Sequence, residues 1–354
     1  MHNSGLAHEL MRMLDHMTIT DTHLARVLDG ADPDVRFQDD LFRAVSGTWL
    51  KNHEIPADLS SDGSFMALVI EAEQHVREII EELAATHPES GEPQQIANFY
   101  NSWMNTEAAN AKGIDPLAAD LKSINAATSK SELAVALGHL LATGVGTFFG
   151  IDVDTDLNNP ERYTTFFYQS GIGLPDEAYY REPQFEEVLA KYRTFVPSFL
   201  QLAYGWSEDV ASTKAAMVLD LEKAIAGTHM NVVDSRDTDK TNNPMSWDAF
   251  VAATPGFPWS ATMTAAGFSS EKLTDVIVLN PEALAKSAQI WENTPLEHLK
   301  AYSRWRVLRS RATFLTEAID KASFDFYGRV LSGATEQRDR WKRGVQIGRA
   351  SCRE

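Results

Sequence analysis

Apolar residues recur every three or four positions along much of the chain, which places them on one face of an α-helix. One such stripe runs through residues 65–83, and a second covers residues 96–104. The sequence SKSE at residues 129–132 is a capping box and predicts the start of a third helix, because its Ser and Glu satisfy free backbone N–H groups. Helical spacing resumes over residues 185–204 and 210–225. The chain is therefore predicted to be mainly helical.

The longest helix is predicted towards the C-terminus. Residues 294–297, TPLE, combine a capping Thr, a Pro at the first helical position and a Glu at the third. The apolar spacing that follows predicts one helix of at least 25 residues, continuing through Ile319.

A change of period marks a small β component. Residues 148–156 alternate apolar and acidic side chains, as a strand with one solvated face does. The turn signal NNP at residues 158–160 leads into an aromatic run at residues 163–168, so these segments predict a β-hairpin. Residues 276–279 form a further short strand candidate. The predicted fold class is mainly α with small β-hairpins.

Composition places the chain among globular proteins and limits its partners. Of its 354 residues, 44% are hydrophobic and 23% charged, so a large core can form. The 50 acidic residues outnumber the 32 Lys and Arg, giving a formal charge of −18. This charge repels phosphate backbones and anionic lipid, so we expect no nucleic acid or membrane partner.

Cysteine use and the absence of apolar segments bear on the compartment. Cys352 is the only cysteine, so no disulfide can form within the chain, and a reducing compartment fits best. The first 21 residues lack the apolar core of a secretory signal, and no stretch reaches the ~18 apolar residues that cross a bilayer. We expect a soluble, cytoplasmic protein.

The histidine spacing does not support a zinc site. A helical zinc motif places two His four residues apart with a Glu after the first, and no two of the ten histidines have that spacing. His8 and His53 are each followed by Glu, but Arg12 and Ala57 stand where the second His belongs. Two more histidines lie on predicted helices and are interpreted as ordinary side chains: His75 and His139.

Other catalytic motifs are also missing. There is no G-x-S-x-G nucleophile elbow, and Cys352 is interpreted as a free thiol. Three closely spaced glycines approach a phosphate-binding pattern without completing it, and a tight turn explains them better: Gly144, Gly146 and Gly150. Three alternating aspartates are either calcium ligands or, the favoured interpretation, a solvated strand face: Asp152, Asp154 and Asp156. We therefore assign no catalytic, cofactor-binding or metal-binding residue.

An ordered series of motifs nevertheless carries a family resemblance. The motifs are DDLFRAVSGTWL (39–50), IPAD (55–58) with SSDGSF (60–65), QIANFYNS (95–102), GIGLPD (171–176) with Tyr179-Tyr180, LEKAIA (221–226), SRD (235–237) with KTNNPMS (240–246), and WKR (341–343). In order and spacing this series resembles the neprilysin and endothelin-converting-enzyme family of zinc metallopeptidases, especially its bacterial oligopeptidase O-like members.

Each motif also has a purely structural interpretation. Five aromatic residues are expected in the core: Trp49, Phe65, Tyr100, Tyr179 and Tyr180. Gly171, Gly173 and Pro175 are expected to shape a turn. Arg236 and Asp237 are expected to form a local ion pair. Where some animal members place a substrate-binding Arg after the paired serines, this chain has Asp62, so that role is not carried over.

The resemblance implies a zinc endopeptidase built as two mainly helical lobes around a cavity that admits peptides. After Val345 the similarity ends, before the H-E-x-x-H motif that family members carry. We therefore expect an incomplete helical lobe that binds no zinc and cleaves no peptide alone, although it is an enzyme by family. The lobe should expose apolar surface and self-associate through it. The alternative is a non-catalytic helical module that binds peptides or a partner.

Three regions are expected along the chain. Residues 1–35 are polar and predict a loosely attached N-terminal extension, with Met17 as an alternative start. Residues 36–345 form the incomplete peptidase region. Residues 346–354 are an aberrant tail of the kind that a frameshift or a shortened gene produces, expected to be disordered or to extend a helix without a partner.

Overall fold

The computed structural model describes residues 29–351, except for the side chains of residue 270 and residues 347–351. The chain divides into two units, Met1–Gly63 and Ser64–Glu354. Most of the expected N-terminal extension, Met17 included, lies outside the described residues.

The described part of the first unit is built around α3 (Leu41–Asn52), the helix of the first family motif. The Asp40 side chain caps it by accepting the backbone N–H three residues on, at 2.9 Å. Asp32 is 5% exposed and pairs with Lys51 at 2.7 Å. A side chain at Gly47 would meet Asp32 at 2.7 Å, so the close approach of these two segments requires glycine there.

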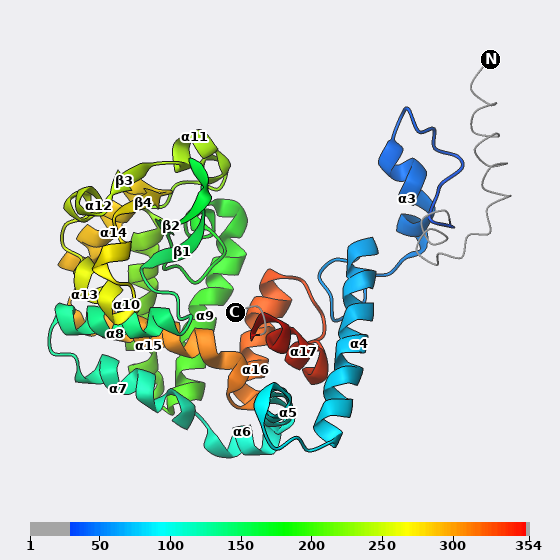
Figure 1. Cartoon of the computed structure of the whole chain (residues 1–354), viewed down its shortest axis with the longest axis horizontal. Helices are drawn as coiled ribbons and strands as arrows, with labels where there is room; N and C mark the ends of the chain where they lie inside the picture. Colours follow the sequence, from blue (N-terminus) through cyan, green and yellow to red (C-terminus); the bar gives the residue numbers. More distant parts are fainter. Residues whose placement is uncertain (1–28, 352–354) are drawn as a thin grey trace. The chain divides into compact units, whose positions relative to one another are not determined.

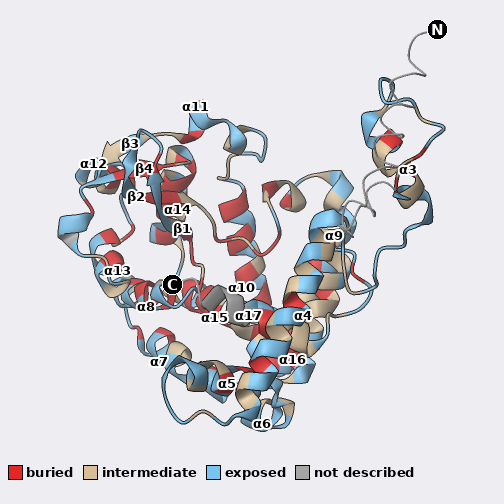
Figure 2. Ribbon diagram, turned by 45° about the vertical axis from the view of Figure 1, so that its right-hand side comes forward, coloured by how far each residue is buried: buried red, intermediate tan, exposed pale blue. Residues whose placement is uncertain are grey.

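Two consecutive helices of the second unit, α4 (Ser64–Ala85) and α5 (Gly91–Met104), pack with a helix distant in sequence, α17 (Arg340–Ser351) (Figure 1). They share a small buried cluster made of Ile80, Tyr100 and Val345. Most of α4 remains half-buried or exposed, because only Glu73 and Ile80 of its 22 residues are buried (Figure 2).

The remaining helices of the second unit surround one large core. The α-helices are α6 (Thr106–Lys112), α7 (Ala118–Ala126), α8 (Lys130–Ala142), α9 (Glu186–Tyr204), α10 (Glu208–Ala226), α11 (Thr238–Thr241), α12 (Trp247–Ala253), α13 (Trp259–Ala265), α14 (Pro281–Asn293), α15 (Leu296–Arg311) and α16 (Glu317–Phe324). Short 3₁₀ turns are η1 (Asp115–Leu117), η2 (Glu177–Tyr180), η3 (Pro183–Phe185), η4 (Asp234–Arg236), η5 (Ser270–Lys272) and η6 (Ala312–Phe314), and η7 (Asp325–Leu331) is a π-helix.

A four-stranded sheet lies within this part of the unit, in the order β1-β2-β4-β3. The strands are β1 (Phe149–Asp156), β2 (Asn159–Gln169), β3 (Pro244–Ser246) and β4 (Asp275–Val278). β1 and β2 form an antiparallel hairpin, β4 runs parallel to β2, and β3 is antiparallel to β4. Aromatic side chains on one face of the sheet pack into the core. Phe167 of β2, for example, lies 4.5 Å from Phe250, centroid to centroid.

The main elements agree with the sequence prediction. The mainly helical fold, the predicted hairpin and the short strand at β4 are confirmed. The capping box is confirmed at α8, where the Ser129 hydroxyl accepts the N–H of Glu132. Within residues 29–351 no helix is long and apolar enough to cross a membrane.

The prediction of one long helix after residue 294 is wrong. α15 ends at Arg311, a 3₁₀ turn follows, and Thr316 caps the separate helix α16 by accepting the N–H of Ile319 at 3.3 Å. Thr294 does not cap α15, because its hydroxyl donates back to the carbonyl of Ile290 in the preceding helix. The apolar period continues across this break because α15 and α16 both face the same core.

The expected core aromatics divide into two groups. Tyr100 and Tyr180 are buried, and Trp49 and Tyr179 are half-buried. The prediction for Phe65 is wrong, since its side chain is 86% exposed on α4. The stripe predicted a helix correctly, but the described residues do not cover that end of its apolar face.

Candidate functional site

The histidines flagged by the sequence do not converge. His53 pairs with Asp62 at 2.7 Å and its ring stacks on Trp49 at 4.2 Å, so it has a local structural role. His75 and His139 are exposed, on α4 and α8. His8 and Cys352 lie outside the described residues.

The described side chains do not fit a catalytic zinc ion. Such an ion needs three protein ligands directed at one point. Among residues 29–351, no group of three or more His, Cys, Asp and Glu is placed to hold a metal. No chemical step through zinc is therefore derived for this part of the chain.

The aspartates of the hairpin are engaged in hydrogen bonds. Asp152 and Asp154 each accept the backbone N–H of the next residue, at 2.8 and 2.6 Å. Asp156 accepts the N–H of Asn158 at 2.7 Å and binds Arg162 at 2.8 Å, which closes the turn. The hydrogen bond from Asn158 lowers the pKa of Asp156, and Arg162 acts in the same direction. Asp152 and Asp154 are exposed, as a solvated strand face predicts, but the prediction is wrong for Asp156, which is 3% exposed because the turn and Arg162 enclose it. Among the described residues these aspartates belong to no group that could hold a metal.

The three glycines near the hairpin serve its packing. Gly144 has φ of 79°, a left-handed conformation in the turn after α8. Gly150 leaves room for the ring of Tyr168 on the neighbouring strand. Arg306 lies over Gly146 and donates to its carbonyl at 2.8 Å. The predicted tight turn is confirmed at Gly144, but the prediction is wrong for Gly150, which lies within β1, and Gly146 lies between the turn and that strand.

The GIGLPD motif forms a turn that buried side chains hold by its backbone. The carbonyl of Gly171, a residue with φ of 99°, accepts a hydrogen bond from Tyr302 Oη at 2.7 Å. The carbonyl of Ile172 accepts from Arg306 at 2.9 Å and from Arg309 at 3.2 Å. The turn predicted from these glycines is thus present, and α15 fixes its position.

The LEKAIA motif supplies the buried acid behind this turn. Glu222, on α10, is 0% exposed and accepts hydrogen bonds from Tyr180 Oη at 2.9 Å, Tyr192 Oη at 2.8 Å and Trp305 Nε1 at 3.0 Å. The backbone N–H groups of residues 173 and 174 both donate to Tyr180 Oη. Two family motifs therefore meet at one buried carboxyl group.

Burial raises the pKa of Glu222, while Arg306, the Tyr192 hydrogen bond and Arg309 act against that rise. Glu222 was not predicted as a site residue from the sequence. The LEKAIA motif could have indicated it, because Glu222 stands at a helix position where the apolar spacing predicts a buried residue. A buried acid needs hydrogen-bond donors around it.

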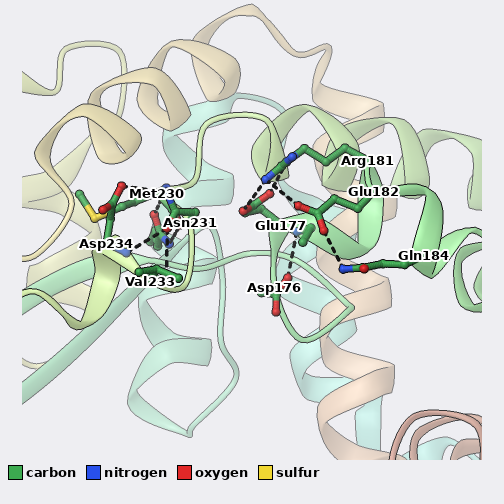
Figure 3. Close-up of polar contacts among 11 residues, drawn as sticks. Asp176, Glu177, Arg181, Glu182, Gln184, Met230, Asn231, Val233 and Asp234 are labelled. Atoms are coloured by element: carbon green, nitrogen blue, oxygen red, sulfur yellow. Dashed lines mark hydrogen bonds and ion pairs between the residues drawn. The ribbon is translucent and has the colours of Figure 1, made fainter.

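Two further polar clusters lie in residues 176–184, which follow the GIGLPD turn, and in the loop of residues 230–234 (Figure 3). In the first, Asp176 caps η2 and Arg181 pairs with Glu177 at 2.6 Å and Glu182 at 3.2 Å. In the second, Asn231 organises its own loop through hydrogen bonds with the Val233 and Asp234 backbone N–H groups. These contacts are local and shape the two loops.

The expected ion pair of Arg236 with Asp237 is wrong. Lys240 is the cation near Asp237, at 3.8 Å, and it contacts Asp234 at 2.5 Å. Asp237 instead caps α11 by accepting the N–H of Asp239.

Residues 340–344, which are the WKR motif and its two flanking residues, dock α17 on α5. Trp103 Nε1 donates to the carbonyl of Arg340 at 2.8 Å, and the Arg340 guanidinium lies 4.4 Å from the Trp103 ring centroid. A side chain at Gly344 would meet that ring at 2.5 Å. Trp341 faces the other way and stacks under Arg77 of α4. This motif therefore joins the C-terminal helix to both helices beside it.

The helix continues into the region expected to be an aberrant tail. α17 extends to Ser351, and the Gln346 side chain donates to Glu73 at 3.1 Å. Gln346 therefore has a partner, whereas residues 352–354 lie outside the described part.

Comparison with known proteins places these motifs in a family. The profile of peptidase family M13, in its N-terminal part, matches residues 37–351. The crystal structure of the zinc metalloprotease Zmp1 of Mycobacterium tuberculosis, in complex with an inhibitor, is similar with a TM-score of 0.86 and 40% identity. The match covers 90% of this chain and 49% of Zmp1.

Curated relatives agree in family and in coverage. Mouse endothelin-converting enzyme 1 is 24% identical over 89% of this chain and 42% of its own length. The neutral endopeptidase of Lactobacillus helveticus is 23% identical over 90% of this chain and 50% of its own. The chain thus spans about half the length of the relatives it matches. With the profile match extending over most of its residues, this chain belongs to peptidase family M13.

Proposed function

We propose that this chain is the N-terminal half of a zinc metalloendopeptidase that cleaves peptides, and that the half described here shapes the enzyme without performing the chemical step. The observation that carries the proposal is the match of the family profile to residues 37–351 together with coverage of only about half of each relative. The lack of a three-ligand group among the described residues supports the second part.

The proposal requires a surface on which the other half of the enzyme rests. On α4, Phe65, Leu68 and Ile79 are 86%, 45% and 63% exposed and fall on one face by the 3.6-residue repeat. Exposed apolar patches of this kind mark interaction surfaces. We assign this α4 face to contact with the second half, and expect it to drive self-association when that half is absent.

Substitution of the α4 face tests this assignment. The chain should bind a hydrophobic dye and associate with rising concentration, and Phe65→Ser with Ile79→Ser should reduce both effects. Tyr163→Ser is the matched control, because Tyr163 is 75% exposed on β2, away from α4. A wild-type chain that stays monomeric and dye-silent at high concentration would count against the α4 interface.

The alternative, a peptide- or partner-binding module, has one structural feature in its favour. A surface cavity of about 510 Å³ lies between α10, α14 and the start of α15, and its lining includes Asp220, Gln289, Asn293 and His298. The DNA that follows this coding segment discriminates the two proposals. A reading frame that encodes H-E-x-x-H supports the peptidase half, whereas its absence supports the module.

A further inference from the structure

The carboxyl group of Glu222 is surrounded by hydrogen-bond donors. Tyr180 and Tyr192 both bond to Oε2, and Trp305 Nε1 bonds to Oε1. Tyr180 has no freedom to reverse its bond, because its oxygen already accepts two backbone N–H groups. A proton added to Oε2 must therefore turn the Tyr192 hydroxyl, because that oxygen already accepts two hydrogen bonds and the bond from Tyr180 cannot reverse.

A partner for a turned Tyr192 hydroxyl is present. Among the residues that the structure describes, Tyr327 Oη is buried and makes no hydrogen bond of acceptable geometry. Burial raises the pKa of Tyr327 to about 12, and the positive charge of Arg309 acts against that rise. Tyr327 belongs to η7, which packs against α9, and the ring of its neighbour Phe326 lies 5.3 Å from the Tyr192 ring, centroid to centroid. An unsatisfied buried oxygen is costly, and a hydrogen bond from a rotated Tyr192 would relieve that cost.

We propose that Glu222, Tyr192 and Tyr327 form a buried proton-binding site that lets the lobe remain folded with Glu222 either charged or neutral. In the charged state Tyr192 donates to the carboxylate. When one proton from solvent binds Oε2, the new carboxyl O–H donates to Tyr192 Oη, and the Tyr192 hydrogen turns to Tyr327 Oη. No covalent bond other than the new O–H forms or breaks, and the bonds from Tyr180 and Trp305 persist.

The charged and titratable groups around Glu222 come from every element packed against it. They are Tyr180 of η2, Tyr192 of α9, Tyr302, Arg306 and Arg309 of α15, and Tyr327 of η7. The two arginines donate to the carbonyl of Ile172 and act on Glu222 from a distance. They favour the charged form, against the larger effect of burial.

The direction of the pKa shift fixes how stability depends on pH. Burial raises the pKa of Glu222, so the folded chain binds this proton more tightly than the unfolded chain, where Glu titrates near its ordinary value of about 4.3. The stabilisation is fully present below that ordinary pKa and is lost as the pH rises through the folded pKa. Relative to a non-titrating variant, the wild type should therefore gain stability as the solution becomes mildly acidic.

Difference infrared spectroscopy of the full chain and of Glu222→Gln tests the site directly. On lowering the pH, the wild type should show a protonated-carboxyl band that Glu222→Gln lacks, with a midpoint above that of exposed Glu. Tyr327→Phe removes the oxygen that receives the Tyr192 hydrogen and should lower this midpoint. Tyr180→Phe removes a donor to the carboxylate and should raise it.

The two tyrosine variants make the outcome decisive. An identical band in Glu222→Gln, a midpoint at or below that of exposed Glu, or a midpoint that Tyr327→Phe leaves unchanged would each overturn the proposal. If Tyr180→Phe does not fold, because two backbone N–H groups lose their acceptor, the comparison of the midpoints of the wild type and Tyr327→Phe still decides the outcome. A second readout is the difference in melting temperature between the wild type and Glu222→Gln, measured from pH 8 to 5. This difference should shift in favour of the wild type as the pH falls.

Discussion

At the scale of single residues, the family motifs are explained by close packing around a few buried polar groups. Gly173 shows this most clearly, because an added Cβ would overlap Tyr192 Oη and approach Glu222 Oε1 to 2.9 Å. The motif therefore requires a residue without a side chain, and it does so for packing and not for ligand binding. The glycine, the acid and the tyrosines are one structural unit.

Gly173→Ala should consequently destabilise the chain. Overpacking of a well-packed core costs about 1–3 kcal/mol, and here the displaced atoms are hydrogen-bonded, which places the loss at the upper end. Gly227→Ala is the matched control: its Cβ would meet atoms only at 3.4 Å or beyond, and its φ of −64° suits alanine. Urea unfolding of both variants measures the difference, and equal stabilities would refute the packing argument.

At the scale of elements, buried charges hold α17 and the segment just before it to the rest of their unit. Glu73 of α4 is 1% exposed and pairs with Arg338 at 2.7 Å, and it also accepts from Gln346. Asp320 of α16, 5% exposed, pairs with Arg343 at 2.8 Å. Because the shared apolar cluster of these helices is small, such pairs determine how the helices are registered.

Removal of one partner from the Glu73 pair should therefore be costly. We expect Glu73→Ala to lower the free energy of unfolding by about 3 kcal/mol, since it leaves the Arg338 charge without its buried carboxylate. Glu78→Ala on the same helix removes an exposed acid and should change stability by at most about 0.5 kcal/mol. Replacing both partners, Glu73→Leu with Arg338→Met, should restore much of the loss. If Glu73→Ala is as stable as Glu78→Ala, the pair does not anchor α17.

Element scale is also where sequence prediction succeeded and failed for identifiable reasons. The helices and the β1-β2 hairpin were predictable because their apolar periods and caps are local. β3 was not, because its three residues pair with β4, 30 residues away. The break between α15 and α16 was missed because Ala312 and Phe314 are compatible with a helix.

The buried site around Glu222 could not be predicted from local sequence patterns either, because its residues are distant in sequence. Tyr180 and Trp305 lie 42 and 83 residues from Glu222, and only the folded core brings them together. The LEKAIA and GIGLPD motifs indicated the family. They did not show that their residues contact each other in the folded chain. The exposed Phe65 was misplaced because a periodic stripe reports a helix and not what covers it.

At the scale of the whole molecule, the chain is a partial-length member of its family. It matches about half of Zmp1 and of the curated relatives, and the part described here forms a large helical core with no three-ligand metal group among residues 29–351. Catalytic zinc requires three protein ligands directed at one point, and residues 29–351 assemble no such group. Family membership and catalytic activity are therefore separate properties, and each needs its own test.

The most direct test of that separation is metal content and peptide hydrolysis measured on the same purified chain. When zinc is added and the excess is then removed by dialysis, we expect far less than one zinc per chain. We also expect no chelator-sensitive cleavage of a short peptide. Stoichiometry is the criterion because scattered histidines bind zinc weakly. One zinc per chain with chelator-sensitive hydrolysis would contradict the account, and His53 and His75 would be the first residues to substitute.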